Sequence, residues 1–130
     1  MTKRINHSSG APWEKKVGYS RAVKVGDHIS VTGTVAIDDD NQLVGETEYD
    51  QSAFILKKIE KVLNDLGAKR SDVVRTRIFV TNIKNWEGVG KAHGEFFEGI
   101  NPATTMVEVS ALISPEYLVE IEANAIMGQE

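Results

Sequence analysis

The chain has 130 residues, of which 41% are hydrophobic and 26% are charged, and its formal net charge at pH 7 is −4. This length and balance are typical of one globular domain over residues 1–130 with a single core. The acidic charge argues against a nucleic-acid-binding surface, the lack of a run of ~20 apolar residues argues against a membrane span, and the lack of cysteine excludes disulfides and thiolate-bound metals. We therefore expect a cytoplasmic protein.

The first third of the chain predicts a polar arm followed by a pair of strands. Residues 1–12 are polar and contain Ser, Gly and Pro, which is typical of an arm outside the core. The segment VGYSRAVKVGDHISVTGTVAI, residues 17–37, predicts two strands around the turn VGDH. Strict alternation places Tyr19 and Arg21 together on one face of the first strand.

Two amphipathic helices are predicted farther along the chain. Apolar residues recur at steps of three and four from residue 49 to residue 66, and Gly67 follows as a C-terminal stop. Residues 85–100 predict a second helix with Asn85 as its N-cap. Its apolar side is predicted to carry Trp86, Val89, His93, Phe96 and Phe97.

The remaining segments predict three more strands. DVVRTRIFVTNI, residues 72–83, is rich in branched side chains. INPATTMVEVSALISPEYLVEIEANAI, residues 100–126, contains two strand-like runs on either side of a short loop. This order of elements predicts an α+β fold, in which a mixed β-sheet carries two helices packed on one face.

The sheet face that the two helices leave bare is predicted to be of mixed polarity. Such a face is too polar for a core and too apolar to be entirely solvated. We therefore expect a closed oligomer whose sheets pack together, with polar residues lining clefts between subunits. Strict alternation assigns to this face Thr32, Thr34, Met106, Glu108, Leu118, Glu120, Glu122 and Ile126.

Three segments of the chain together resemble the YjgF/Rid family of reactive-intermediate deaminases, also described as endoribonuclease L-PSP. They are GYSRAVKVGDHISVTGTVAID, LGAKRSDVVRTRIFVTNI and the closing pattern NPATTMVEV followed by VEIEANAI. The resemblance extends over about residues 18–127. It implies a chorismate-mutase-like fold and a homotrimer that binds a small-molecule ligand in three inter-subunit clefts, without a cofactor.

The resemblance also implies roles for individual residues. In the best-known branch, an arginine after the Pro-Ala pair clamps the carboxylate of a 2-imino acid, and a glutamate of the last strand helps water to attack the C=N bond. The glutamate position falls on Glu120 and the arginine position on Thr104. Threonine offers one uncharged donor where arginine offers a charged, bidentate one, so the carboxylate clamp is missing. Gly90, in place of a cleft asparagine, and Met106 are further departures.

Glu120 is the candidate catalytic residue, since a partly buried carboxylate has a raised pKa that suits it to handling water. Its alternative role is a charge in a solvated channel or an ion pair between subunits. Arg21 is a candidate substitute for the missing positive charge, and its alternative role is an interface salt bridge, for instance to Glu14 or Glu108. Tyr19 falls on an aromatic position of the family's cleft.

Thr32 and Thr104 can hydrogen-bond a ligand, although threonine is also a common structural residue of strands. The three histidines do not have metal-ligand spacing, so no metal site is expected.

These features predict a small-molecule hydrolase that deaminates imines, enamines or related reactive metabolites, with Glu120 orienting water. One alternative is a trimer that binds small ligands without catalysis. Another is an endoribonuclease of the L-PSP type, which the acidic charge and the scattered cations disfavour.

Overall fold

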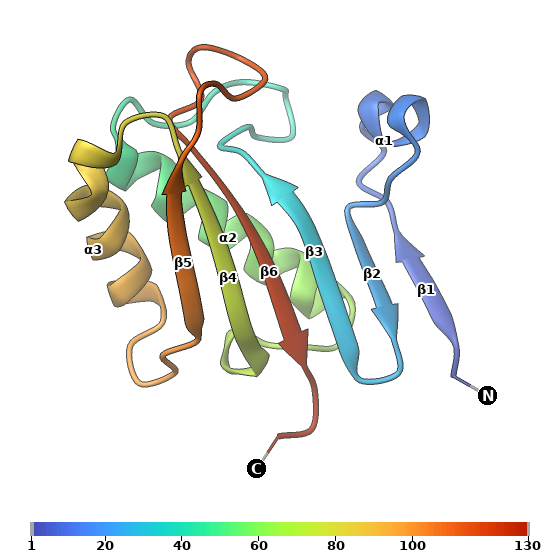
Figure 1. Cartoon of the computed structure of the whole chain (residues 1–130). Helices are drawn as coiled ribbons and strands as arrows, with labels where there is room; N and C mark the ends of the chain where they lie inside the picture. Colours follow the sequence, from blue (N-terminus) through green and yellow to red (C-terminus); the bar gives the residue numbers. More distant parts are fainter. Residues whose placement is uncertain (1, 130) are drawn as a thin grey trace.

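The computed structural model describes residues 2–129 and contains one six-stranded sheet with two long helices on one face (Figure 1). The strand order is β1-β2-β3-β6-β4-β5. Neighbouring strands are antiparallel except β4 and β5, which are parallel, so the predicted mixed sheet is confirmed. In chain order the elements are β1 Arg4–His7, α1 Pro12–Val17, β2 Ala22–Val25, β3 His28–Thr34, α2 Glu48–Asp65, η1 Arg70–Asp72, β4 Val73–Val80, η2 Ile83–Asn85, α3 Trp86–Phe96, β5 Ala103–Glu108 and β6 Val119–Ile126.

The long helix α2 begins and ends as its sequence predicts. Thr47 is its N-cap, and the Thr47 hydroxyl oxygen accepts a hydrogen bond of 3.1 Å from the Asp50 amide. Gly67 follows the helix with a φ of +89°, a conformation that glycine adopts without strain. The apolar stripe of α2, which includes Ile55, Leu56, Ile59 and Leu63, is buried against the sheet.

The predicted position of Thr34 on the bare sheet face is wrong. Val31 pairs with Ala123 and Thr34 pairs with Ile121, so three steps along β3 oppose two steps along β6. This extra residue is a β-bulge, and it reverses the alternation of side chains after it. Thr34 is consequently 1% exposed on the helix-covered side, where its hydroxyl donates to the Thr32 carbonyl oxygen over 2.8 Å.

Met106 and Glu108 also lie on the helix-covered side rather than on the bare face. The reason is the parallel register with β4, because Met106 pairs with Ile78 and Glu108 pairs with Val80, whose side chains are buried beneath the helices. Met106 packs against the core, and a Glu108 carboxylate oxygen accepts from the Ile83 amide over 3.0 Å.

Two smaller predictions are corrected by the structure, and a third is confirmed in position only. Part of the predicted arm forms the edge strand β1, which pairs with β2 from Arg4 opposite Val25 onward. Trp86 is 52% exposed and its ring lies along α3 against Gly90 instead of in the core. Asn85 occupies the predicted N-cap position of α3, but it makes no side-chain capping hydrogen bond, and its side-chain amide donates to Glu48 over 2.8 Å.

Candidate functional site

Glu120 lies on the bare face of β6, one residue before the Ile121 that pairs with Thr34, and its side chain reaches back to Gly33 in the bulge of β3. Its carboxylate occupies space that only glycine leaves free, because a Cβ atom built on Gly33 would lie 2.1 Å from Glu120 Oε2. On the other side Glu120 pairs with Phe79 of β4. The bulge and its glycine therefore form a niche for this carboxylate at the middle of the sheet.

Arg21 closes the same niche from the loop that precedes β2. Its Nη2 atom donates to the Gly33 carbonyl oxygen over 3.0 Å, and its Nε atom is buried with no hydrogen-bond partner among the described residues. Burial lowers the pKa of the Arg21 guanidinium, whereas Tyr19, Glu14 and Glu120 raise it. An arginine remains protonated under these influences, so it contributes a fixed positive charge beside two carboxylates.

The pKa of Glu120 is raised by its surroundings. Burial raises this pKa, the positive charge of Arg21 lowers it, and the negative charge of Glu122 raises it again, with a net increase. A carboxylate of this kind is a stronger base than an exposed one, and the nearby positive charge of Arg21 favours its ionised form. Glu120 is therefore suited to accept a proton from water and return it.

Glu14 supports Arg21 from the short helix α1. Although it is 5% exposed, its carboxylate accepts hydrogen bonds from the Ser8 hydroxyl over 2.9 Å, from the Ser9 amide over 3.2 Å and from the Ser9 hydroxyl. Burial alone would raise the pKa of Glu14, but these hydrogen bonds and the charge of Arg21 lower it overall. Glu14 thus remains ionised, and its negative charge acts on Arg21 in addition to that of Glu120.

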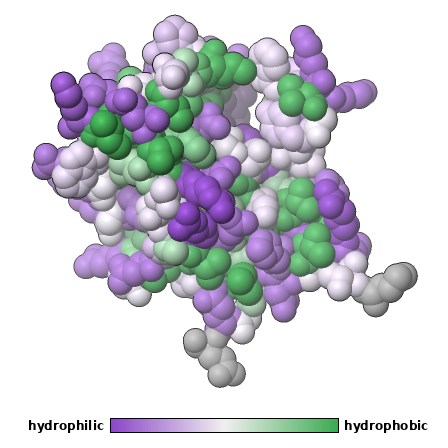
Figure 2. All heavy atoms as spheres, in the orientation of Figure 1, coloured by the Kyte–Doolittle hydropathy of each residue, from purple (hydrophilic) through white to green (hydrophobic). Residues whose placement is uncertain are grey.

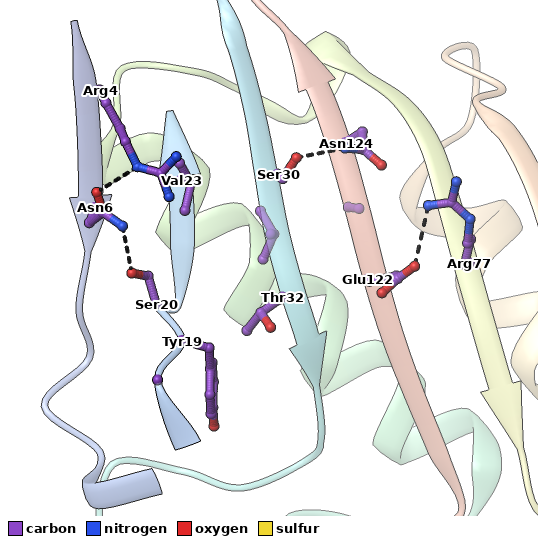
Figure 3. A pocket seen from close by; sticks show the side chains of 13 residues that line it. Arg4, Asn6, Tyr19, Ser20, Val23, Ser30, Thr32, Arg77, Glu122 and Asn124 are labelled. Carbon is purple, nitrogen blue, oxygen red and sulfur yellow. Dashed lines mark hydrogen bonds and ion pairs between the residues drawn. The ribbon is translucent and has the colours of Figure 1, made fainter. Parts of the chain in front are cut away.

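A polar groove of about 460 Å³ crosses the bare face beside this niche (Figure 3). Tyr19 and Thr32 line it, and Tyr19 is 38% exposed. Figure 2 shows hydrophilic and hydrophobic side chains mixed over the bare sheet face, as the sequence predicts. Most of the polar side chains in the groove bond one another, in the pairs Arg4 with Asn6, Asn6 with Ser20, Ser30 with Asn124 and Arg77 with Glu122.

A second polar cluster lies on the opposite, helix-covered side, at the edge strand β5. Thr104 Oγ1 is 2.9 Å from Thr76 Oγ1, which is 2.8 Å from His93 Nε2 of α3. The Thr104 hydroxyl also donates to the Pro102 carbonyl oxygen over 3.1 Å. Burial lowers the pKa of His93, whose ring packs on Phe97 with a centroid distance of 4.7 Å. The cluster is therefore uncharged at neutral pH.

The predicted site residues consequently form two groups on opposite faces of the sheet. Thr104 pairs with Thr76 and faces α3, whereas Glu120 pairs with Phe79 and faces away from the helices. One chain alone cannot present Glu120 and Thr104 to the same small ligand. Glu120 lies in the niche with Arg21, beside the groove lined by Tyr19 and Thr32. Thr104 lies on the side of His93 and Met106, and Gly90 belongs to the same helix as His93.

Two further observations concern metal ions and membranes. Within residues 2–129, no group of three or more His, Asp or Glu side chains is arranged to hold a metal ion. None of the helices in this part of the chain is long and apolar enough to span a bilayer.

The sequence analysis did not identify Gly33 or Thr76 as site residues, although the sequence pattern around each is informative. Gly33 interrupts an otherwise regular strand pattern, which is typical of a bulge or a close approach. Thr76 alternates with Ile78 and Val80 at positions that face the core, where a hydroxyl needs a partner. Glu14 was considered only as an ion-pair partner, because its contacts with Ser8 and Ser9 depend on the turn before α1.

Substituting Gly33 with alanine is expected to displace the Glu120 carboxylate while leaving the fold intact. The added methyl group would overlap Glu120 Oε2, and a glutamate side chain can rotate away toward solvent. The pKa of Glu120 should then fall toward its ordinary value because burial no longer raises it. Carboxyl NMR titration measures this change, and Gly94→Ala, whose Cβ would meet nothing within 4 Å, is the matched control. An unchanged Glu120 titration would contradict the proposed niche.

Known proteins are similar to this chain over nearly its whole length. The family model described as endoribonuclease L-PSP matches residues 11–127. The chain is 32% identical over 127 residues to a RutC family protein of Pyrococcus abyssi, covering 96% of this chain and 98% of that protein. It is similar to the crystal structure of a YjgF/YER057c/UK114 family member from Mycobacterium tuberculosis, with 46% identity, a TM-score of 0.88 and coverage of 96% and 100%. A Rid family protein from Yersinia pestis is 32% identical, with a TM-score of 0.84 and the same coverage.

Proposed function

The chain belongs to the endoribonuclease L-PSP family, also named the YjgF or Rid family, and we propose that it is a hydrolase of small imines, enamines or related reactive metabolites. The observation that carries this proposal is the placement of Glu120. It is a half-buried carboxylate with a raised pKa, held in a glycine niche beside Arg21.

The proposed reaction converts an imine and water into a carbonyl compound and ammonia. Glu120 accepts a proton from water as the water oxygen bonds to the imine carbon, and the C=N double bond becomes a single bond. The nitrogen takes up this proton. The hydroxyl proton of the resulting carbinolamine then moves to nitrogen through Glu120, the C–N bond breaks, and ammonia leaves as the C=O bond forms.

We further propose that the active site is assembled between copies of the chain in a homotrimer. Glu120 and Thr104 face opposite sides of one sheet, and a cleft shared by two subunits is the arrangement that lets both face one ligand. The bare face, with its mixed polarity and its groove, supports burial against another copy. In this proposal one subunit supplies Glu120 with Tyr19, Arg21 and Thr32, and its neighbour supplies Thr104 with Gly90 and Met106.

A ligand-binding trimer without catalysis is the second candidate. It is favoured by Thr104, whose hydroxyl already bonds Thr76 and Pro102 and brings no charge to the cleft. The endoribonuclease alternative has less support, because the net charge is −4 and the charge of Arg77 is partly offset by its ion pair with Glu122. That Arg21 contacts the ligand remains a prediction.

The experiment that tests catalysis is ammonia release from a freshly generated imine as a function of pH. Glu120 must be ionised to accept a proton, so the enzymatic rate is expected to fall as the pH falls through its pKa. Since burial raises that pKa, the acid limb should lie above 4.5, the ordinary value for glutamate. The spontaneous rate without protein is subtracted at each pH. A rate no greater than the spontaneous one, together with binding of 2-keto acids, would favour the ligand-binding trimer.

A further inference from the structure

The contacts around Thr104 determine which way its hydroxyl points. The cluster makes three contacts shorter than 3.2 Å, from His93 to Thr76, from Thr76 to Thr104 and from Thr104 to the Pro102 carbonyl. Each needs one proton. All three are satisfied when His93 Nε2–H donates to Thr76, Thr76 donates to Thr104 and Thr104 donates to Pro102. The reverse direction leaves the Pro102 contact without a proton.

This chain of hydrogen bonds makes Thr104 an oriented, neutral donor at the surface. Thr76 is fully buried. Burial lowers the pKa of His93 and so favours its neutral ring, whose single N–H lies on Nε2 in this direction of the hydrogen bonds. Thr104 is exposed at the edge strand β5. A ligand acceptor can therefore take the place of the Pro102 carbonyl, while the second lone pair of the Thr104 oxygen remains able to accept from a ligand N–H.

The cations on the neighbouring elements are engaged elsewhere. Arg75 of β4 donates to Thr105 over 2.7 Å, and Thr105 lies on the opposite face of β5 from Thr104. Lys91 of α3 lies over the Tyr49 ring, 5.3 Å from its centroid. Arg70 is paired with Glu60. A carboxylate bound at Thr104 would lose water without gaining a positive partner from its own half of the cleft, which is costly. Arg21 in the other half lies near Glu14 and Glu120, whose negative charges offset its own.

We propose that the half-site around Thr104 binds an uncharged carbonyl group, of the carboxamide type, in place of a carboxylate, and that Thr76 and His93 are positioning residues for the Thr104 hydroxyl. A carboxamide supplies both an acceptor for the Thr104 proton and an N–H for its free lone pair. This inference deepens the proposed function and depends on the same inter-subunit cleft, but it concerns binding and does not require turnover.

The test compares pyruvamide with pyruvate, two planar ligands of nearly equal size that differ in charge. Their dissociation constants for the assembled protein are measured by calorimetry or by ligand-observed NMR. The wild type is expected to bind pyruvamide at least about tenfold more tightly, and Thr104→Arg is expected to reverse this preference. Thr104→Val should weaken pyruvamide binding about tenfold by removing the hydrogen-bonding hydroxyl. Thr105→Val, one residue farther along β5 on the other face, is the matched control and should change neither constant.

A separate pair of variants tests whether His93 positions the Thr104 hydroxyl through Thr76. His93→Leu removes the donor to Thr76 and is expected to weaken pyruvamide binding severalfold with no effect on pyruvate, whereas His93→Gln, which can still donate an N–H, should restore it. Circular dichroism and size-exclusion chromatography check that each variant is folded and assembled.

Equal affinity of the wild type for both ligands, a preference for pyruvate, or no binding of either at millimolar concentration would overturn the inference. The two proposals fail separately. A preference for pyruvamide without ammonia release would refute only the hydrolase, and ammonia release without this preference would refute only the inference.

Discussion

Replacing Glu120 with glutamine is expected to lower the enzymatic rate of imine hydrolysis by about 10²- to 10⁴-fold, which is the usual contribution of a general base. Glutamine has nearly the same shape and fits the niche that Gly33 leaves, so the fold and the assembly should persist. It cannot accept a proton from water. Because the amide is neutral at all accessible pH values, the acid limb of the pH profile should also disappear from the residual rate.

Glu122→Gln is the matched control for this substitution. Glu122 lies two residues farther along β6 on the same face, where it pairs with Arg77 over 3.3 Å at the groove. Its loss should change the rate by less than about threefold, since exposed ion pairs contribute little free energy. Comparable losses in the two variants would mean that the rate depends on the general negative charge of this face, and a fully active Glu120→Gln variant would exclude Glu120 as the base.

Replacing Ile121 with alanine is expected to lower the free energy of unfolding by about 2–5 kcal/mol. Ile121 is 0% exposed and lies in the central strand β6, where it pairs with Thr34 on one side and with Ile78 on the other. Its removal leaves a cavity between the sheet and the helices. Well-ordered neighbours on both strands can fill that cavity only in part.

Urea denaturation at one fixed protein concentration measures this effect, because the stability of an oligomer depends on concentration. Ile113→Ala is the control, since Ile113 is 82% exposed in the loop before β6 and its loss should change stability by less than about 0.5 kcal/mol. If Ile113→Ala destabilised the protein as much as Ile121→Ala, the loop would have to be buried by another copy of the chain.

Much of the fold could be predicted from local patterns. The stop at Gly67 was predicted because it acts within one helical turn, and the cap at Thr47, which the sequence analysis did not name, acts over the same short range. Buried and less buried residues alternate strictly along β6, with Val119, Ile121 and Ala123 buried and Glu120 on the other face. The alternation of side chains in a strand was therefore enough to predict which face carries its carboxylates. These features need no knowledge of distant contacts.

Most of the failures have a different cause, which is the pairing of strands that the local sequence does not determine. The bulge that buries Thr34 is defined only against β6, and the side chosen by Met106 depends on its register with Ile78. The edge strand β1 is polar by itself and becomes ordered through its pairing with β2. Trp86 is a separate case, because it is apolar but lies at the start of α3, where its ring rests on Gly90 of the same helix and stays 52% exposed.

The candidate site was predicted in part for the same reason. Glu120 and Thr104 follow from the resemblance of the closing segment, but a sequence does not show that they face opposite sides of one sheet. The niche at Gly33 and the chain from His93 to Thr104 join residues from three strands and a helix. Such contacts become visible only after the sheet is assembled.

The central claim is that each site takes Glu120 from one subunit and Thr104 from its neighbour. It is tested most directly by dissociating and mixing two inactive variants, Glu120→Gln and Thr104→Trp, in equal amounts. In randomly reassembled trimers about one quarter of the clefts combine an intact Glu120 half with an intact Thr104 half, so about one quarter of the wild-type rate should return. If mixed trimers form, as native mass spectrometry can verify, and no activity returns, the two halves do not belong to one inter-subunit site.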